Sequence, residues 1–175
     1  MKSQLNKVLE LGYKEVYKKR THLLREGYSA NDLFYIEKGL VRVYYLKGGK
    51  EITDWFGTSN TYLTSISGFY QNKKSTQYIE TIEDSIIHTI KKSEIEKECM
   101  NKPEIERDYR QIIVNHLVRL QERITALQFY SASERYDLLL KKNPYVIKRA
   151  SRTDIASYLG ISLETLSRVS SNVII

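Results

Sequence analysis

The residues best suited to chemistry lie near the end of the chain, between Arg152 and Arg168. Apolar residues recur there at a spacing of four, and the small Ala156 precedes Gly160 by four positions. Glycine ends a helix cheaply in the left-handed conformation because it has no Cβ. Ser162 then provides an N-cap for a second helix. The spacing predicts a helix-turn-helix whose second helix could enter the major groove of DNA.

The second predicted helix presents polar side chains on its outer face. An arginine at 168 can donate two hydrogen bonds to guanine, and a carboxylate at 164 can accept one from cytosine. Arg152 and Thr153 stand at the start of the first helix, where they would bind phosphate. The candidate DNA-contacting residues are Arg152, Thr153, Ser162, Glu164, Thr165, Ser167 and Arg168. A helical hairpin that does not touch DNA is the alternative.

The charge of the chain suits a polyanionic partner. Its 175 residues carry a net charge of +7, and the isoelectric point is about 9.3. From Ser131 onward, seven basic residues face four acidic ones, an excess of three in a quarter of the chain. Charge alone does not decide the partner, since ribosomal and membrane-surface proteins are equally basic. The single Cys99 excludes a disulfide framework. No apolar run suits a signal peptide or a membrane span, so we expect a cytoplasmic protein without a membrane partner.

The first half of the chain has the pattern of a β-structure. Residues 1 to about 20 suggest a short helical lead-in, and strand-like segments separated by turns follow from Thr21 to Thr89. Turns are expected at Lys38–Gly39 and at Lys47–Lys50. Short strands at this spacing indicate an antiparallel barrel or roll.

A long helix is predicted from Pro103 onward. Apolar residues recur along it at spacings of four and three, which is a heptad pattern: Ile113, Leu117, Leu120, Ile124 and Leu127. A helix of this length has too little protein around it to cover both faces, which favours a parallel coiled-coil dimer. Packing against the chain's own β domain is the alternative, and opposite faces could serve both purposes.

These patterns together predict an α+β protein. We expect an N-terminal antiparallel β-roll over residues 1–102. A long dimerisation helix over 103–130 and a C-terminal helix-turn-helix domain over 131–175 would follow.

This order of elements, and the residues themselves, resemble the Crp/Fnr family of transcription regulators. Leu23–Gly27 and Asn31–Val43 are similar to the opening of the family's cyclic-nucleotide-binding-type jelly roll, which would be the effector domain. Ser131–Tyr136 is similar to the helix after its dimer helix. Asp154–Arg168 resembles its DNA-recognition segment most specifically. The resemblance implies a homodimer that binds palindromic double-stranded DNA, with RNA polymerase as a possible further partner.

The resemblance also suggests which bases are contacted. Glu164, Ser167 and Arg168 match the family's base-contacting set. The position before the glutamate is arginine in the catabolite-activator branch but Leu163 here, which resembles the Fnr-type branch with its TTGA-like half-sites.

The effector pocket departs from the family pattern. Members that bind cyclic AMP carry Gly-Glu for the ribose and Arg-Ser/Thr for the phosphate. Alignment places Thr64 and Ser65 at the first pair and Ser75 and Thr76 at the second, and Gln121 at a base-contacting position of the long helix. Because the arginine and the glutamate are both absent, we expect no binding of cyclic AMP, and an unidentified small effector or none at all.

Other cofactors and activities find little support in the sequence. One cysteine cannot hold the iron–sulfur cluster of Fnr-type oxygen sensors. His22, His88 and His116 lack metal-ligand spacing, so no metal is expected. The roll has the architecture of cupin enzymes, but the clustered His and Glu ligands of a cupin are absent. We therefore expect no enzymatic activity and no certain cofactor.

Two functions remain open at this stage. One is a dimeric sequence-specific regulator, and the other is an effector-binding or interaction module whose helix-turn-helix does not bind DNA. The second is conceivable because the sequence ends seven residues after Arg168, without the β-hairpin wing of many members. A naturally short form and a truncated chain are both compatible with this end. The effector, the target genes and the sign of regulation stay undetermined.

Overall fold

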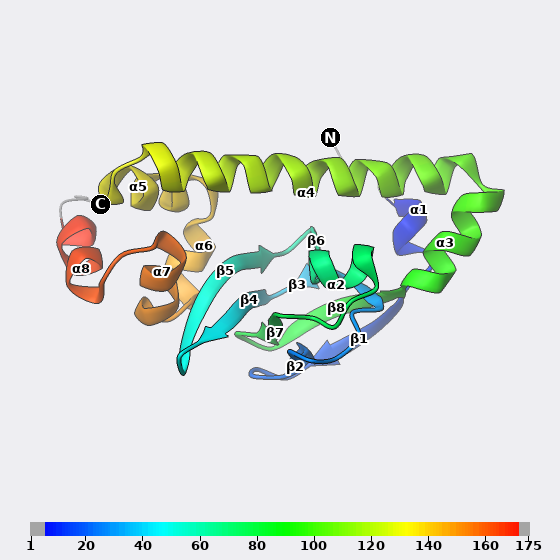
Figure 1. Cartoon of the computed structure of the whole chain (residues 1–175), viewed down its shortest axis with the longest axis horizontal. Helices are drawn as coiled ribbons and strands as arrows, with labels where there is room; N and C mark the ends of the chain where they lie inside the picture. The colour runs from blue at the N-terminus through cyan, green and yellow to red at the C-terminus, as the bar shows by residue number, and fades with distance from the viewer. Residues whose placement is uncertain (1–5, 172–175) are drawn as a thin grey trace.

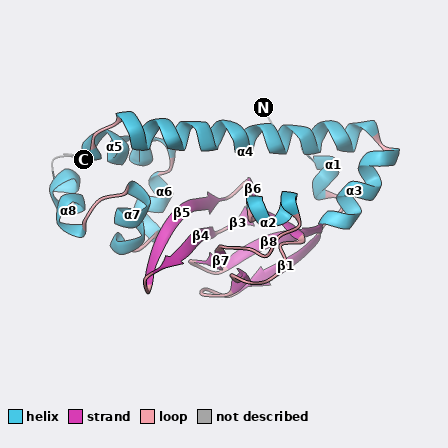
Figure 2. Ribbon diagram, in the orientation of Figure 1, coloured by secondary structure: helices cyan, strands magenta, loops and turns pink. Residues whose placement is uncertain are grey.

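Two four-stranded antiparallel sheets form the N-terminal roll of the computed structural model, which describes residues 6–171. One sheet has the order β1-β8-β3-β6 and the other β2-β7-β4-β5 (Figures 1 and 2). The strands are β1 (Tyr13–Tyr17), β2 (His22–Leu24), β3 (Asp32–Lys38), β4 (Leu40–Lys47), β5 (Lys50–Thr58), β6 (Thr61–Leu63), β7 (Tyr78–Thr81) and β8 (Ser85–Lys91). The predicted antiparallel roll is therefore confirmed.

The core of the roll is built from apolar residues on the inner faces of both sheets. Phe34 and Ile87 come from one sheet and Val43 and Ile79 from the other, and all four are buried in one cluster. Alternation of buried and exposed positions places them there, since successive side chains of a strand point to opposite faces.

The two expected turns have different roles. Lys47–Lys50 closes a true hairpin between β4 and β5. At Gly39, by contrast, the chain leaves one sheet and enters the other, because β3 pairs with β6 and β8 while β4 pairs with β5 and β7. Gly39 has a φ of +122°, and a Cβ there would lie 2.1 Å from the Oγ of Ser85. This corner requires glycine.

The helical lead-in expected over residues 1–20 is wrong for most of its described length. A short helix α1 (Asn6–Leu9) is followed by β1, whose residues pair with β8. Aromatic and β-branched side chains favour the strand, and the partner strand decides it. Three further helices were not predicted: α2 (Ile66–Gln71), α3 (Lys92–Asn101) and α6 (Pro144–Arg149). Residues 1–5 lie outside the described part of the chain.

The long helix is α4 (Pro103–Phe129), which runs along one side of the roll and connects the two ends of the molecule (Figure 1). Its 27 residues span about 40 Å. It begins with a proline, whose missing N–H is not needed in a first turn. It ends before Ser131, which forms a capping box with Glu134 at the start of α5 (Ala132–Lys142). Ile105, Ile112 and Ala126 are its buried residues.

The C-terminal helices pack together at one end of the roll. They include α7 (Arg152–Leu159) and α8 (Leu163–Ser171), with Leu139, Ile155 and Leu166 buried between them. The same cluster contains Leu40 and Phe56 of the roll, so the two parts share a core. None of the described helices is long and apolar enough to cross a membrane.

Candidate nucleic-acid interface and ligand site

Helices α7 and α8 form the predicted helix-turn-helix. Ser151 caps α7 by accepting a hydrogen bond from the Asp154 backbone N–H at 3.0 Å. The helix ends at Gly160, which has a φ of 65° and a ψ of 39° in the left-handed region. The Ile161 N–H then donates to the Ala156 carbonyl at 3.0 Å. Gly160 therefore makes the tight turn that its lack of a Cβ permits.

Helix α8 presents an apolar face inward and a polar face outward. Leu166 is buried, whereas Glu164, Ser167 and Arg168 are exposed. The Ser162 hydroxyl accepts a hydrogen bond from the Thr165 N–H at 3.2 Å and thus caps the helix. One guanidinium nitrogen of Arg168 donates to the Thr165 hydroxyl at 3.2 Å, which holds the arginine along the outer face.

The outer face of α8 has the chemistry needed to bind base edges. A hydrogen bond from the Ser162 side chain lowers the pKa of Glu164, so this group is a carboxylate and accepts hydrogen bonds at neutral pH. The exposed Arg168 guanidinium supplies donors one helical turn away. Arg152 and Thr153 are exposed at the start of α7. The structure thus leaves the predicted base-contacting and phosphate-contacting side chains open to a partner.

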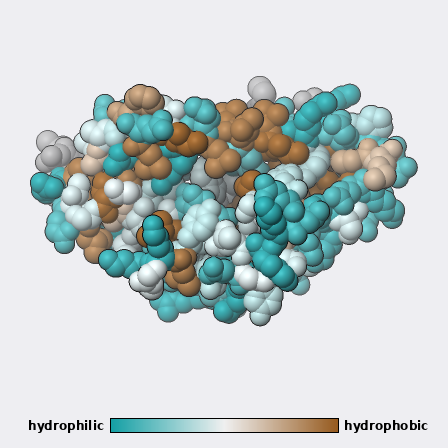
Figure 3. Space-filling model, in the orientation of Figure 1, coloured by the Kyte–Doolittle hydropathy of each residue, from teal (hydrophilic) through white to brown (hydrophobic). Residues whose placement is uncertain are grey.

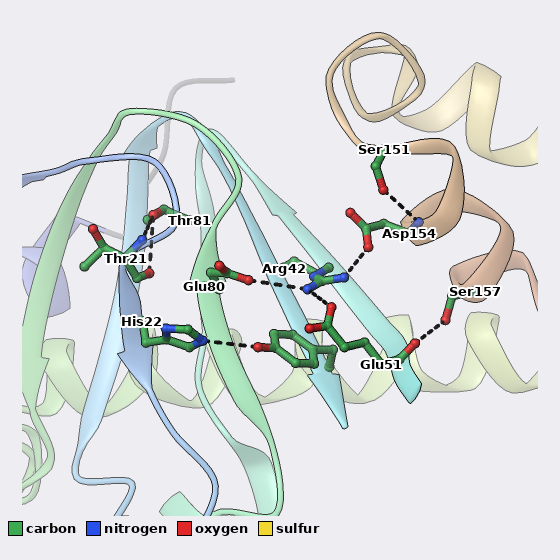
Figure 4. A network of polar contacts seen from close by, with 10 residues as sticks. Thr21, His22, Arg42, Glu51, Glu80, Thr81, Ser151, Asp154 and Ser157 are labelled. Carbon is green, nitrogen blue, oxygen red and sulfur yellow. Dashed lines mark hydrogen bonds and ion pairs between the residues drawn. The ribbon is translucent and has the colours of Figure 1, made fainter. Parts of the chain in front are cut away.

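A buried arginine fixes α7 on the roll. Arg42 of β4 is only 5 % exposed and pairs with three carboxylates: Glu51 of β5, Glu80 of β7 and Asp154 of α7 (Figure 4). Burial opposes its charge, but the hydrogen bond to Glu51 and the three negative charges outweigh this and raise the pKa of Arg42. This network was not predicted from the sequence, since its members lie far apart along the chain.

A second contact continues the same junction. The Ser157 hydroxyl of α7 accepts a hydrogen bond from the Thr53 N–H at 2.8 Å and donates to the Glu51 carbonyl at 3.2 Å. Figure 4 shows Asp154 facing Arg42 of β4 and Ser157 facing Glu51 of β5, whereas Ser151 bonds to the Asp154 backbone of its own helix. The first helix of the motif is therefore docked on β5, and α8 lies beyond it at the end of the molecule (Figure 1).

The outer face of α4 is an apolar stripe that residues 6–171 leave exposed. Its five heptad residues have exposed fractions of 37 % to 65 %, with Leu117 the most exposed of them. Val114 and Val118 widen it. Figure 3 shows apolar surface gathered along the helix. The stripe consists of Ile113, Leu117, Leu120, Ile124 and Leu127. An exposed apolar surface of this kind marks an interaction site.

A pocket lies between the inner face of α4 and the roll. Its cavity volume is about 60 Å³. Helix α4 contributes His116, Arg119, Leu120 and Arg123, and the roll side contributes the other lining residues, which are Val43, Asp54, Trp55, Leu63, Thr64, Ile66 and Gln77. We call this space the α4 pocket. Within residues 6–171, no three His, Cys, Asp or Glu residues lie close enough to hold a metal ion.

Comparison with known proteins identifies the roll. The cyclic nucleotide-binding domain family matches residues 14–102, which is 89 of the 175 residues. The chain belongs to the cyclic nucleotide-binding domain family. The match covers the strands of both sheets together with α2 and α3, so the family assignment rests on the whole roll and is independent of the helix-turn-helix.

Relatives of this family extend the likeness beyond the roll. The chain is 23 % identical to the anaerobic regulatory protein of Bacillus subtilis, over 95 % of this chain and 76 % of the relative. Among solved structures, FixK2 from Bradyrhizobium japonicum superposes with a TM-score of 0.78 at 24 % identity, over 91 % of this chain and 83 % of FixK2. The c-di-GMP-responsive regulator CLP of Xanthomonas campestris has a TM-score of 0.74 at 20 % identity, over 96 % and 89 %. The resemblance to Crp/Fnr regulators is thereby confirmed.

Of the five effector residues expected from the sequence, Thr64 alone lines the α4 pocket. Thr64 lines the α4 pocket, where its hydroxyl donates to the Asp32 carbonyl at 2.8 Å. Ser65 and Ser75 are buried and hydrogen-bonded to each other at 2.9 Å, and neither lines the pocket. Thr76 and Gln121 are exposed. The pocket instead takes most of its polar groups from residues that the sequence did not single out.

The missed pocket residues had a signal in the sequence. His116, Arg119 and Arg123 are spaced by three and four, so they share one side of α4. They lie beside the heptad stripe, roughly a quarter turn around the helix, on the side that packs over the roll and where an amphipathic pattern would place apolar residues. Cationic side chains on the inner face of a helix are the clue that could have located the pocket.

Proposed function

We propose that the chain is a sequence-specific DNA-binding transcription regulator that acts as a homodimer. The observation that carries the proposal is the outer face of α8, where Glu164, Ser167 and Arg168 are exposed on a helix held by a capped, glycine-ended turn. Known relatives are regulatory proteins, which supports a regulator rather than an enzyme.

A second copy of the chain would cover the apolar stripe of α4. Two parallel α4 helices related by a two-fold axis would present two copies of α8 on one side of the dimer. A dimer of this symmetry binds a palindrome whose half-sites lie about one turn of DNA, or about 34 Å, apart. The stripe and the helix-turn-helix therefore support the same proposal from different parts of the molecule.

The exposed residues divide between two kinds of contact. Arg168 would bind the O6 and N7 of a guanine, Glu164 would accept from the N4 of a cytosine, and Leu163 would contact a thymine methyl group. The other candidate contacts are Ser162 just before α8 and Thr165 and Ser167 within it. Arg152 and Thr153 at the start of α7 would bind phosphate and fix the register without distinguishing bases.

A DNA titration distinguishes the base contacts from the phosphate contacts. Arg168→Ala should cost about 1–3 kcal/mol on a TTGA-type palindrome and relax the preference at one base pair. Arg152→Ala is the matched variant and should weaken binding to all duplexes alike. The slope of log binding constant against log salt concentration should become shallower by about one unit. Both are titrated on the palindrome and on random duplex at two salt concentrations. Equal weakening of both duplexes by Arg168→Ala would favour the interaction-module alternative.

Cyclic AMP should not be the effector. Thr64, Ser65, Ser75 and Thr76 supply hydroxyl groups but no arginine, so a cyclic phosphate there would lack a bidentate cation. We expect no calorimetric signal with cyclic AMP at sub-millimolar concentration. Binding tighter than about 10 μM would contradict this expectation.

A further inference from the structure

An open cleft separates the roll from the start of the helix-turn-helix. Its volume is about 590 Å³, much larger than that of the α4 pocket. On the roll side, Lys19 and Arg20 of the connection between β1 and β2 line it. On the other side, it is lined by residues 149–151, which lead into α7. We call this space the junction cleft. Figure 4 shows Thr21, which follows Arg20, on one side of Arg42 and the loop before α7 on the other.

The carboxylates in and around the junction cleft already have cationic partners. The acidic residues that line the cleft all pair with Arg42, and they are Glu51, Glu80 and Asp154. In the turn between β7 and β8, Asp84 pairs with Lys18 at 2.9 Å, and Glu83 lies 4.0 Å from Arg149. Within the described part of the chain, none of these carboxylates pairs with Lys19 or Arg20.

Lys19 and Arg20 are exposed cations on a fixed backbone. Among residues 6–171, neither side chain forms an ion pair or a hydrogen bond. Their backbone is held nevertheless, because the Lys19 N–H donates to the Asp84 carboxylate at 2.8 Å and the Arg20 N–H donates to the Thr81 carbonyl at 2.8 Å. The Thr81 hydroxyl also donates to the Lys18 carbonyl at 2.7 Å. The turn therefore presents two free positive charges at the cleft.

The backbone conformation of Arg20 is an independent observation. Its φ of 63° lies in the left-handed region, which is unfavourable for a residue with a long side chain. The other non-glycine residues with a positive φ among residues 6–171 are Asn60 and Asn72, and asparagine tolerates this conformation. An arginine at a position that suits glycine or asparagine brings strain that no contact of its side chain offsets within residues 6–171. This points to a use of its charge outside the chain.

The free cations adjoin the surface that we propose binds phosphate. Arg152 and Thr153 are exposed at the start of α7, directly after the cleft wall at residues 149–151. Lys19 and Arg20 lie across the cleft from that wall. Exposed cations along an open cleft suit the backbone of DNA, in which each strand carries one charge per about 3.4 Å of helix axis. A small anion is more often held in an enclosed and largely apolar pocket.

We propose that Lys19 and Arg20 of the roll bind the phosphate backbone of the DNA that flanks the site contacted by α8. The proposal rests on the proposed DNA binding and adds a second contact from another part of the chain. Helix α7 lies between α8 and the roll, so a duplex that reaches both α8 and the junction cleft bends toward the roll (Figure 1). The added phosphate contacts offset the cost of bending. They increase affinity without distinguishing bases.

Duplexes of two lengths test this contact. The short duplex holds a TTGA-type palindrome in about 20 base pairs, which covers two half-sites one helical turn apart. The long duplex adds about 10 base pairs, or one further turn, on each side. Fluorescence anisotropy measures binding of the full chain to each duplex at one salt concentration. We expect the wild type to bind the long duplex more tightly by about tenfold or more.

A variant of the turn assigns this gain to the two cations. Lys19→Gln combined with Arg20→Asn removes both charges, and asparagine suits the left-handed backbone at position 20. The double variant should bind the short duplex as the wild type does and lose the gain from the flanks. Lys73→Gln is the matched control, because Lys73 is an exposed lysine of the roll that does not line the cleft and has no side-chain partner among residues 6–171. It should bind both duplexes as the wild type does. Circular dichroism verifies the fold of each variant.

Two results would overturn the flank contact alone: equal affinity of the wild type for both lengths, or a gain from the flanks that the double variant keeps in full. In either case the palindrome is still bound more tightly than random duplex of the same length, and the regulator stands. If the palindrome is bound no better than random duplex at either length, the proposed function is wrong and the flank contact is wrong with it.

Discussion

The two faces of α4 differ in the residues that they carry. The outer face repeats one kind of residue at heptad spacing, and these side chains are exposed in the single chain. The inner face begins and ends with buried apolar residues and places His116, Arg119 and Arg123 between them. The regular face is the one that we propose a second copy covers, since these side chains stay exposed among residues 6–171. The irregular face is the one that packs on the roll of the same chain and lines the α4 pocket.

The largest effect should come from charging the outer face. Leu117 is 65 % exposed, and in a two-fold dimer each substitution is present twice. Burial of a leucine contributes about 1.5–3 kcal/mol, so Leu117→Lys should weaken the dimer by about 3–6 kcal/mol, or roughly 10²- to 10⁴-fold. Sedimentation equilibrium measures the dissociation constant, and operator binding should be lost in parallel.

Gln111→Lys provides the control for that variant. Gln111 is exposed on the same helix but lies off the heptad stripe, so the same charge there should leave the dimer nearly unchanged. A wild-type protein that stays monomeric at tens of micromolar, an ordinary range for dimer affinities, would show that the outer face has another partner.

On the inner face, the two arginines should differ in their effect on stability. Arg123→Met removes a charged hydrogen bond to the Tyr158 carbonyl, which is worth about 1.5–3 kcal/mol. Arg119→Met loses only the contact with Trp55, about 0.5–1 kcal/mol, and relieves a half-buried charge at the same time. We therefore expect a clear loss of unfolding free energy for the first and almost none for the second in urea titrations. Equal losses would show that Arg119 is a structural residue.

The smallest effect concerns His116 and pH. Burial lowers the pKa of His116, the Arg119 charge acts in the same direction, and the hydrogen bond to the Tyr62 carbonyl opposes them. The unfolded chain, with a histidine pKa near 6.5, then binds more protons than the folded chain as the pH falls below about 6.5. Stability should therefore decrease as the pH is lowered through that window and stay level above it.

His116→Gln should flatten this dependence, because glutamine can still donate to the Tyr62 carbonyl but does not titrate. Urea midpoints at pH 7.5 and 5.5 give the comparison. Identical slopes for the variant and the wild type would assign the pH dependence to other groups.

The helix-turn-helix could be predicted because its determinants are local. Gly160 in the left-handed region, the capping serines Ser151 and Ser162 and the buried Leu166 all lie within one short segment. Each of these residues contacts neighbours within one or two helical turns, so its spacing along the sequence is enough to predict its contacts. Most strands after β1 and the long helix followed from periodicity for the same reason.

The junction between the motif and the roll could not be predicted in this way. Arg42 contacts Glu51, Glu80 and Asp154, and the separation from Asp154 is 112 residues. Nothing in the sequence near Arg42 indicates that it is buried. Its partners become known only when β4, β5, β7 and α7 meet.

The sequence by itself determined most strands of the roll, the long helix with its outer stripe and the turn between α7 and α8, since these depend on the spacing of residues along one segment, but not β1, α2, α3 or α6. Tertiary structure alone decided the α4 pocket. Thr64 was the expected effector residue that lines it, while Arg119 and Arg123 became its polar groups because the inner face of α4 packs over Trp55 and Asp54 of β5. A pocket is made of surfaces from distant segments, and whether a polar side chain lines it or lies outside depends on which strands the fold places beneath the helix.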